Sequence, residues 1–183
     1  MVAGSVGGRR LHTPPGRRLR PTTERVREAV FATLTSIDAI AGARVLDLFA
    51  GTGALGIEAL SRGAVHATFV DADETAMAMV RANLLRTGFT EQAKLVRGDA
   101  VRYVETAADS AGGVAGGVAG GVEAYDLVLA DPPYSFDDWA RLLAGLRAPV
   151  AVLESDRPVD AGPAWSAQTR RYGDSVVTLV RRL

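Results

Sequence analysis

Short apolar runs alternate along most of the chain with stretches whose apolar residues recur at helical spacing. Runs of this kind, bounded by turn residues, predict buried strands, and the 3.6-residue period predicts helices between them. From residue 44 onward the alternation therefore predicts a doubly wound α/β sheet. The predicted strands cover residues 44–49, 67–71, 94–97, 125–130 and 150–154, and the predicted helices cover residues 54–62, 74–86, 100–107 and 137–146.

The end of the chain departs from this alternation. Two further predicted strands, residues 168–172 and 175–180, are joined by Gly173 and Asp174, a two-residue hairpin signal. An α/β sheet that ends in a hairpin must carry an antiparallel strand at or near one edge. We therefore expect a mixed sheet in which the first five strands have the order 3-2-1-4-5, so that strands one and four are neighbours.

The first part of the chain predicts a basic arm over residues 1–21, followed by a domain over residues 22–183. Thr22 or Thr23 can cap a helix with Glu24 in its first turn, and its apolar face carries Val26, Val30, Thr33, Leu34 and Ile37. Residues 111–122 repeat Ala-Gly-Gly-Val three times, which predicts a flexible loop without chemistry.

The charge is distributed unevenly. The chain has 21 basic and 21 acidic residues, but residues 1–27 hold seven arginines against one glutamate, so they carry +6 and the rest carries −6. A basic arm on an acidic domain is typical of nucleic-acid binding, although a solvated tail of that composition is equally compatible. The candidate RNA contacts are Arg9, Arg10, Arg17, Arg18 and Arg20.

Composition excludes several classes of protein. The 183 residues include no cysteine, which excludes disulfide scaffolds, thiol nucleophiles and zinc fingers. No stretch is long and apolar enough for a membrane span, and the first residues lack the apolar region of a secretory signal. His12 and His66 have no ligand-like partner in sequence, so no metal site is expected. We expect a cytoplasmic, monomeric protein.

The first candidate site follows the first predicted strand. Gly51, Gly53 and Gly56 form G-x-G-x-x-G between a strand and a helix, and Asp71 ends the next strand 20 residues after Gly51. The glycines alone are weak evidence, but this context favours a nucleoside cofactor whose ribose hydroxyls bind Asp71.

Asp47, at the end of that first strand, distinguishes between two cofactors. Its carboxylate would repel a pyrophosphate about 4 Å away by roughly 4 kcal/mol at an effective dielectric of 20. The same carboxylate would attract the ammonium and sulfonium groups of S-adenosylmethionine. An alternative role for Asp47 is that of a cap or loop anchor.

Two further segments follow the third and fourth strands. Asp99 can face an adenine amino group, and it can also cap the next helix. Asp131, Pro132, Pro133 and Tyr134 would lie beside the glycine loop, because strands one and four are neighbours. The Asp131 carboxylate and the Pro132 carbonyl offer two acceptors, and Tyr134 offers a flat ring, which together match an amine on a planar base. The cofactor contacts predicted around these motifs are Asp47, Phe49, Ala50, Gly51, Gly53, Asp71, Ala72, Asp99 and Ala100.

These motifs resemble a known family. Residues 8–11, 19–31, 45–64 and 131–134 together are similar to the RsmD-type guanine-N2 methyltransferases of bacterial 16S rRNA. The resemblance implies a seven-stranded, Rossmann-like class I methyltransferase fold, S-adenosylmethionine as cofactor and a guanine of the small ribosomal subunit as substrate. It also implies that Arg20, Pro21 and Thr22 close over the cofactor and the active site, which makes Thr22 a further predicted cofactor contact, and that residues 131–134 hold the guanine.

Three other functions remain open from the sequence. A DNA adenine or cytosine amino-methyltransferase would share the chemistry but needs a region that reads duplex bases, for which the chain has little room. Methylation of a protein amide uses a related Pro-Pro-Tyr motif. A non-enzymatic RNA-binding assembly factor would need neither the glycine loop nor the Asp-Pro-Pro-Tyr motif.

Overall fold

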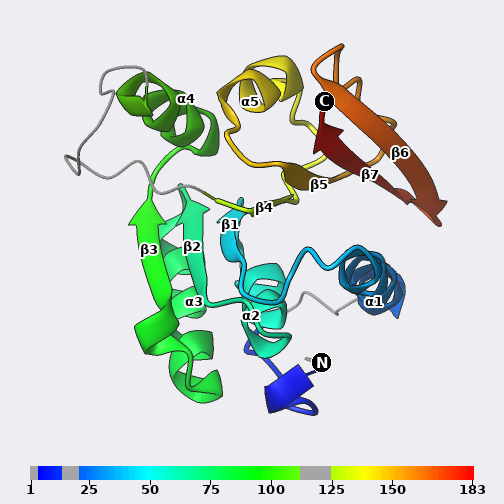
Figure 1. Ribbon diagram of the computed structural model, residues 1–183. Helices are drawn as coiled ribbons and strands as arrows, with labels where there is room; N and C mark the ends of the chain where they lie inside the picture. Colours follow the sequence, from blue (N-terminus) through cyan, green and yellow to red (C-terminus); the bar gives the residue numbers. More distant parts are fainter. Residues whose placement is uncertain (1–3, 14–20, 112–124) are drawn as a thin grey trace.

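The computed structural model describes residues 4–13, 21–111 and 125–183, which build a seven-stranded sheet of order β3-β2-β1-β4-β5-β7-β6 (Figure 1). β1 to β5 are parallel, β7 is antiparallel to β5, and β6 is antiparallel to β7. The predicted strand order and the antiparallel C-terminal hairpin are therefore confirmed. The strands are β1 Arg44–Leu48, β2 His66–Asp71, β3 Ala93–Arg97, β4 Leu127–Ala130, β5 Val150–Ser155, β6 Trp165–Tyr172 and β7 Ser175–Arg182.

The helices form two layers, one on each face of the sheet. In Figure 1, α1, α2 and α3 lie on one side of the sheet, and α4 and α5 lie on the other. The helices are α1 Pro21–Ser36, α2 Ala54–Ser61, α3 Glu74–Thr87, α4 Ala100–Ala111 and α5 Trp139–Gly145, with short 3-10 turns η1 Gly4–Val6 and η2 Thr90–Gln92.

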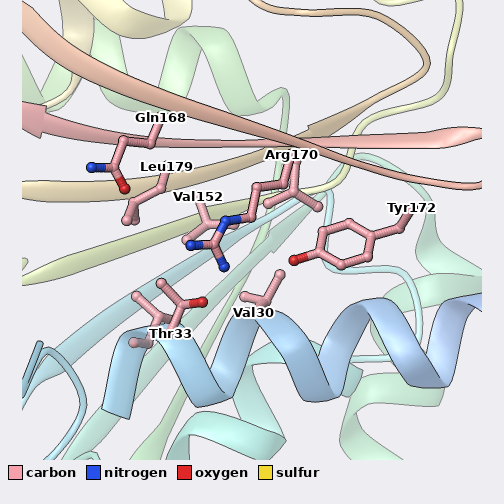
Figure 2. Close-up of a pocket in the computed structure, with 9 residues that line it drawn as sticks. Val30, Thr33, Val152, Gln168, Arg170, Tyr172 and Leu179 are labelled. Atoms are coloured by element: carbon pink, nitrogen blue, oxygen red, sulfur yellow. The ribbon is translucent and has the colours of Figure 1, made fainter. Parts of the chain in front are cut away.

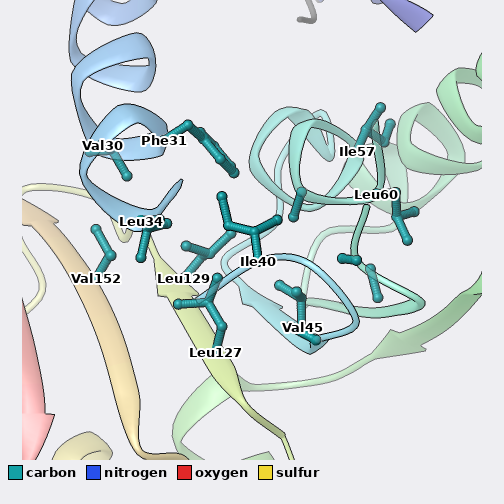
Figure 3. Close-up of a cluster of buried hydrophobic side chains, with 14 of the residues drawn as sticks. Val30, Phe31, Leu34, Ile40, Val45, Ile57, Leu60, Leu127, Leu129 and Val152 are labelled. Carbon is teal, nitrogen blue, oxygen red and sulfur yellow. The ribbon is translucent and has the colours of Figure 1, made fainter. Parts of the chain in front are cut away.

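An apolar core fills each of the two interfaces between helices and sheet. On the first face, Phe31 and Leu34 of α1 are fully buried against residues of α2, β1, β4 and β5 (Figure 3). Val26 and Val30 of the predicted apolar face are also buried, so α1 is held against the parallel strands. The second core lies under α4 and α5 and includes both tryptophans, Trp139 and Trp165.

Most element boundaries agree with the sequence prediction, but α4 ends at Ala111, four residues after the predicted end, and the start of β6 also differs. This strand begins at Trp165, three residues before the predicted start. It pairs only with β7, and six consecutive residues after Trp165 are exposed. An edge strand that faces water on both sides has no apolar alternation, so its first half gives no sequence signal. The Ala-Gly-Gly-Val segment falls almost wholly outside the described residues, and its flexibility stays a prediction.

The first half of the predicted arm packs on the domain. The Val6 amide donates to Ser61 Oγ of α2 at 3.1 Å, and the Arg9 guanidinium donates to the Arg86 carbonyl at the end of α3 at 2.6 Å. The His12 amide donates to Asn83 Oδ1 at 2.6 Å. Residues 4–13 are thus tied to α2 and α3. Arg17, Arg18 and Arg20 lie outside the described residues.

In the part of the chain that the structure describes, none of the helices combines the length and apolar character of a membrane span.

Candidate active site at the carboxyl edge of the sheet

The carboxyl ends of β1, β2 and β4 bring the predicted site residues together. Leu48 pairs with Val70 on one side and with Ala130 on the other. The glycine loop after β1 therefore leaves the sheet between Asp71 at the end of β2 and Asp131 directly after β4. Asp131 and Asp71 both act electrostatically on Asp47, which places the three carboxyl groups in one neighbourhood.

The loop between β1 and α2 turns sharply through left-handed backbone conformations. Phe49 has φ 58°, Gly51 has φ 56° and Gly53 has φ 77°. Glycine adopts this region without strain, whereas a bulky residue such as Phe49 adopts it at a cost of about 1–3 kcal/mol. The turn ends β1 one residue earlier than predicted, and Gly53 is the N-cap of α2.

Gly56 allows α2 to approach the sheet closely. A Cβ at this position would lie 2.4 Å from Phe69 Cε1 of β2 and 3.0 Å from Asp47 Oδ2. The third glycine of the motif is therefore required for packing of the helix against the strand.

Asp47 is buried in this loop. Its side chain is 1% exposed, and Oδ2 accepts a hydrogen bond of 2.9 Å from the Gly56 amide in the first turn of α2. Burial raises the pKa of Asp47 well above its usual range, Asp131 and Asp71 raise this pKa further, and the Gly56 hydrogen bond opposes the shift. The anchoring role left open by the sequence is present, and the cofactor contact stays a prediction.

Asp71 and Asp99 also hold backbone amides. Asp71 Oδ2 accepts from the Gly51 amide at 2.8 Å, and Oδ1 accepts from the Asp73 amide at 2.9 Å. Asp99 Oδ1 accepts from the Arg102 amide at 2.8 Å in the first turn of α4, as predicted for a cap. Each carboxylate has about four acceptor positions, so these bonds leave capacity for ligand hydroxyl or amino groups.

The Asp131-Pro132-Pro133-Tyr134 segment forms the rim of the site. Pro132 is buried, whereas Asp131, Pro133 and Tyr134 are exposed. The Tyr134 side chain is 45% exposed, and its hydroxyl lies 3.3 Å from Ser175 Oγ in the first position of β7. The ring is thus accessible to a ligand while its hydroxyl end is held by the C-terminal hairpin.

Glu154 lies beside the site, and the sequence did not indicate it. In the sequence it is only the last residue of a predicted apolar strand. Burial raises its pKa, and a hydrogen bond with Ser175 opposes that shift. Ala130 pairs with Leu153, so Glu154 lies in the strand next to β4 at the level of Asp131. Its position beside Asp131 could have been predicted only by placing the carboxyl ends of the fourth and fifth strands at the same level.

Two other residues missed by the sequence support the segment that follows β4. The Phe136 ring packs edge-on against Phe49, with ring centroids 5.1 Å apart, and against Trp139 at 5.0 Å. The Arg157 guanidinium donates to the carbonyls of Tyr134 and Phe136, each at 3.4 Å. The Phe49–Phe136 contact joins the glycine loop to the segment after β4, and Arg157 joins that segment to the chain after β5.

The remaining predicted cofactor contacts differ in how exposed they are. Ala50 and Ala100 are buried, and Ala72 is exposed at the end of β2. Thr22 lies in the first turn of α1, but its side chain is outside the described residues. Among residues 4–13, 21–111 and 125–183, no group of three or more His, Asp or Glu side chains is arranged to hold a metal ion.

The chain has recognisable relatives among known proteins. The family model described as "Conserved hypothetical protein 95" matches residues 1–180. The chain belongs to this family. Its resemblance to RsmD-type proteins is confirmed by relatives: Ribosomal RNA small subunit methyltransferase D of Escherichia coli K12 is 35% identical over 136 residues, and the proposed rRNA methyltransferase YlbH of Bacillus subtilis is 40% identical over 134 residues. Each match covers 73% of this chain, and the chain spans 59% and 66% of these two relatives.

Solved structures that are similar to this chain confirm the fold. A hypothetical protein from Thermus thermophilus has a TM-score of 0.77 and 28% identity over 98% of this chain and 96% of its own. TrmN from the same species aligns with a TM-score of 0.65 over 86% of this chain and 49% of its own, at 22% identity, and supports the fold alone. The chain therefore has the class I methyltransferase fold that the sequence predicted.

Proposed function

We propose that this protein transfers a methyl group from S-adenosylmethionine to the exocyclic N2 amine of a guanine in 16S rRNA, acting on the small ribosomal subunit. The observation that carries the proposal is the neighbourhood of Asp47, Asp71 and Asp131 around the glycine loop. Three carboxyl groups there disfavour a phosphate-bearing cofactor and favour a cationic one. The names of the relatives support rRNA as the substrate.

The residues present fit S-adenosylmethionine. The raised pKa of Asp47 indicates a buried carboxyl group that no cation among the described residues offsets, and an ammonium or sulfonium group would complement it. Gly51 carries no side chain, and a Cβ there would meet only the Phe49 carbonyl at 3.8 Å, so the loop leaves open space. Asp71 would hold the ribose hydroxyls, and Asp99 and the Ala100 amide would hold the adenine. When bound, this cofactor supplies an electrophilic methyl carbon on its sulfonium.

The residues after β4 would prepare the amine. The lone pair of an aromatic amine is delocalised into its ring, which makes it a poor nucleophile. Hydrogen bonds from its two N–H groups to the Asp131 carboxylate and the Pro132 carbonyl favour the pyramidal geometry in which the lone pair is available. The motif then accelerates transfer mainly by orientation, because it holds the amine against the methyl donor. The proton released afterwards goes to Asp131 or to water.

The test is transfer of labelled methyl to small ribosomal subunits purified from a strain that lacks this gene. We expect label that elutes as N2-methylguanosine after digestion of the RNA. Label on another nucleoside would retain the chemistry and reject guanine N2. No label on subunits, free RNA, DNA or ribosomal protein, with cofactor binding intact, would favour a non-enzymatic RNA-binding factor.

Replacement of Tyr134 by alanine tests the stacking role of its ring. We expect Tyr134→Ala to lose about 1–3 kcal/mol of binding to the target base, which is the usual contribution of base stacking on an aromatic ring. The measurement is kcat/KM for small subunits. Tyr134→Phe is the matched control, because it keeps the ring and removes only the hydroxyl that lies near Ser175. Equal losses in both variants would show that the hydroxyl, and not stacking, is what matters.

A further inference from the structure

A pocket lies between α1 and the β5–β7–β6 end of the sheet, outside the site described above (Figure 2). Its floor is apolar and its rim is polar. Figure 2 shows Arg170 and Tyr172 extending from β6 towards α1, with Val30 and Thr33 on the helix side. The floor residues are Val30, Leu34, Val152, Val177 and Leu179, and the rim residues are Thr33, Gln168, Arg170 and Tyr172.

Three polar side chains of the rim come from β6. Within residues 4–13, 21–111 and 125–183, the side chains of Gln168, Arg170 and Tyr172 have no hydrogen bond or ion pair. The Gln168 amide, the Arg170 guanidinium and the Tyr172 hydroxyl therefore lie around an apolar floor and can each form further hydrogen bonds. Ligand sites commonly have this composition, in which apolar surface supplies contact and a few polar groups fix orientation.

The register of the sheet connects this pocket to the active site. Arg170 pairs with Val177, Val177 pairs with Glu154, and Glu154 lies level with Asp131. Three spacings of about 4.8 Å put the Arg170 backbone about 14 Å from that of Asp131 along one row. Tyr172 pairs with Ser175, whose Oγ is 3.3 Å from the Tyr134 hydroxyl. The pocket and the proposed base site are therefore neighbours along the same edge.

We propose that the polar rim of this pocket contacts a nucleotide of the rRNA strand that flanks the target guanine, with Arg170 donating to its phosphate. The inference rests on the proposed function, since it assumes an RNA substrate at Tyr134. A guanidinium presents a planar pair of donors that matches phosphate geometry. The pocket has a free volume of about 30 Å³, so the base and ribose would lie across its opening and not inside it, where the Gln168 amide on the rim can contact a base edge.

Arg171 provides the matched control within the same strand. Successive residues of a strand point to opposite faces, so Arg171 faces away from the pocket, and it too is exposed without an ion pair among the described residues. Charged residues on an edge strand also serve to prevent edge-to-edge pairing. That role would be shared by both arginines, whereas a pocket contact belongs to Arg170 alone.

The experiment compares Arg170→Ala with Arg171→Ala in methyl transfer to small subunits from a strain that lacks the gene. We expect Arg170→Ala to raise KM for the subunit about tenfold, as for loss of a charge-assisted hydrogen bond, with kcat and cofactor affinity unchanged. Arg171→Ala should change KM less than about twofold. In equilibrium binding of the subunits, the log–log salt slope of Arg170→Ala should fall by about 0.7, the value for one phosphate of a single strand.

Each outcome decides the proposal. Equal rises in KM for both variants would indicate a general effect of surface charge and would overturn the pocket contact. A wild-type KM and salt slope for Arg170→Ala would also overturn it. If the wild-type protein binds subunits but transfers no methyl group, the proposed function fails separately, and the difference in salt slope between the two variants still decides whether the pocket holds a phosphate.

Discussion

Asp131→Ala should reduce kcat for methyl transfer by about a hundredfold or more, a larger effect than its loss of cofactor affinity, because Asp131 is exposed and its charge is screened by solvent. The carboxylate is proposed to accept a hydrogen bond from the reacting amine, and a charge-assisted bond of this kind contributes about 1.5–3 kcal/mol. Loss of orientation adds to this effect, because the remaining acceptor, the Pro132 carbonyl, cannot alone fix the amine against the methyl donor. The measurement is single-turnover methyl transfer at saturating cofactor and RNA, together with a calorimetric Kd for S-adenosylmethionine.

Asp174→Ala is the control for Asp131→Ala. Asp174 lies in the turn between β6 and β7, next to Ser175, and is exposed. Its removal makes the same change in net charge near the site, without touching the Asp131–Tyr134 segment. A wild-type rate in Asp174→Ala and a large loss in Asp131→Ala would assign the effect to the hydrogen bond. A rate near wild type in Asp131→Ala would remove Asp131 from the proposed mechanism.

The strands of the sheet could be predicted because each is marked locally in the sequence, and the same mark recurs from strand to strand. Most of the parallel strands are buried and appear as short apolar runs, and each run is followed by a glycine, an aspartate or a proline close to its end. β6 gave no such signal over its first half, since an edge strand exposed on both faces can carry any polar residue. Prediction of the fold therefore succeeded where burial constrains the residue type.

The site was predicted where the order of the strands alone places a residue, and it was missed where side-chain directions decide the contact. Asp47, Asp71 and Asp131 lie at the ends of their strands, so strand order alone brings them together. The contacts of Phe136 with Phe49, of Arg157 with the Tyr134 carbonyl, and of Tyr134 with Ser175 depend on side-chain directions and on the pairing of β5 with β7. Nothing in the sequence specifies those directions.

The roles of the aspartates show a second reason why sequence alone is incomplete. Motif spacing indicated ligand contacts for Asp47, Asp71 and Asp99, and in the structure all three accept hydrogen bonds from backbone amides. A carboxylate at the end of a strand can shape the loop and bind a ligand at once, because it has several acceptor positions. A pattern of residue types does not distinguish the two roles.

Asp47→Asn should weaken cofactor binding and stabilise the fold. The asparagine oxygen can still accept from the Gly56 amide, so the loop anchor is kept, whereas the buried negative charge is lost. Removal of one partner of a buried charge pair costs about 3–5 kcal/mol, so the Kd for S-adenosylmethionine should rise about a hundredfold or more. The same change removes a group whose ionisation in the unliganded protein is opposed by burial and by Asp131 and Asp71.

The pH dependence of Asp47→Asn follows from the direction of the pKa shift. Because the folded pKa of Asp47 is raised, the folded protein binds more protons than the unfolded chain between the usual and the raised pKa, and the stability of the wild type falls as pH rises through that window. The thermal midpoint of Asp47→Asn should therefore exceed that of the wild type most clearly at pH values above the window. Wild-type affinity for the cationic cofactor should decrease as pH falls through the raised pKa, and that of the variant should not.

Asp126→Asn is the matched control for both effects. Asp126 also accepts a backbone amide, from Arg44 at 2.8 Å, but its side chain is exposed. It lies at the start of β1 and β4, at the opposite edge of the sheet from the site. We expect Asp126→Asn to show wild-type cofactor affinity and no gain in the thermal midpoint. A loss of affinity in Asp47→Asn accompanied by a lower thermal midpoint would mean that the ionised carboxylate is needed to hold the loop, and Asp47 would then be an anchor and not the partner of the cation.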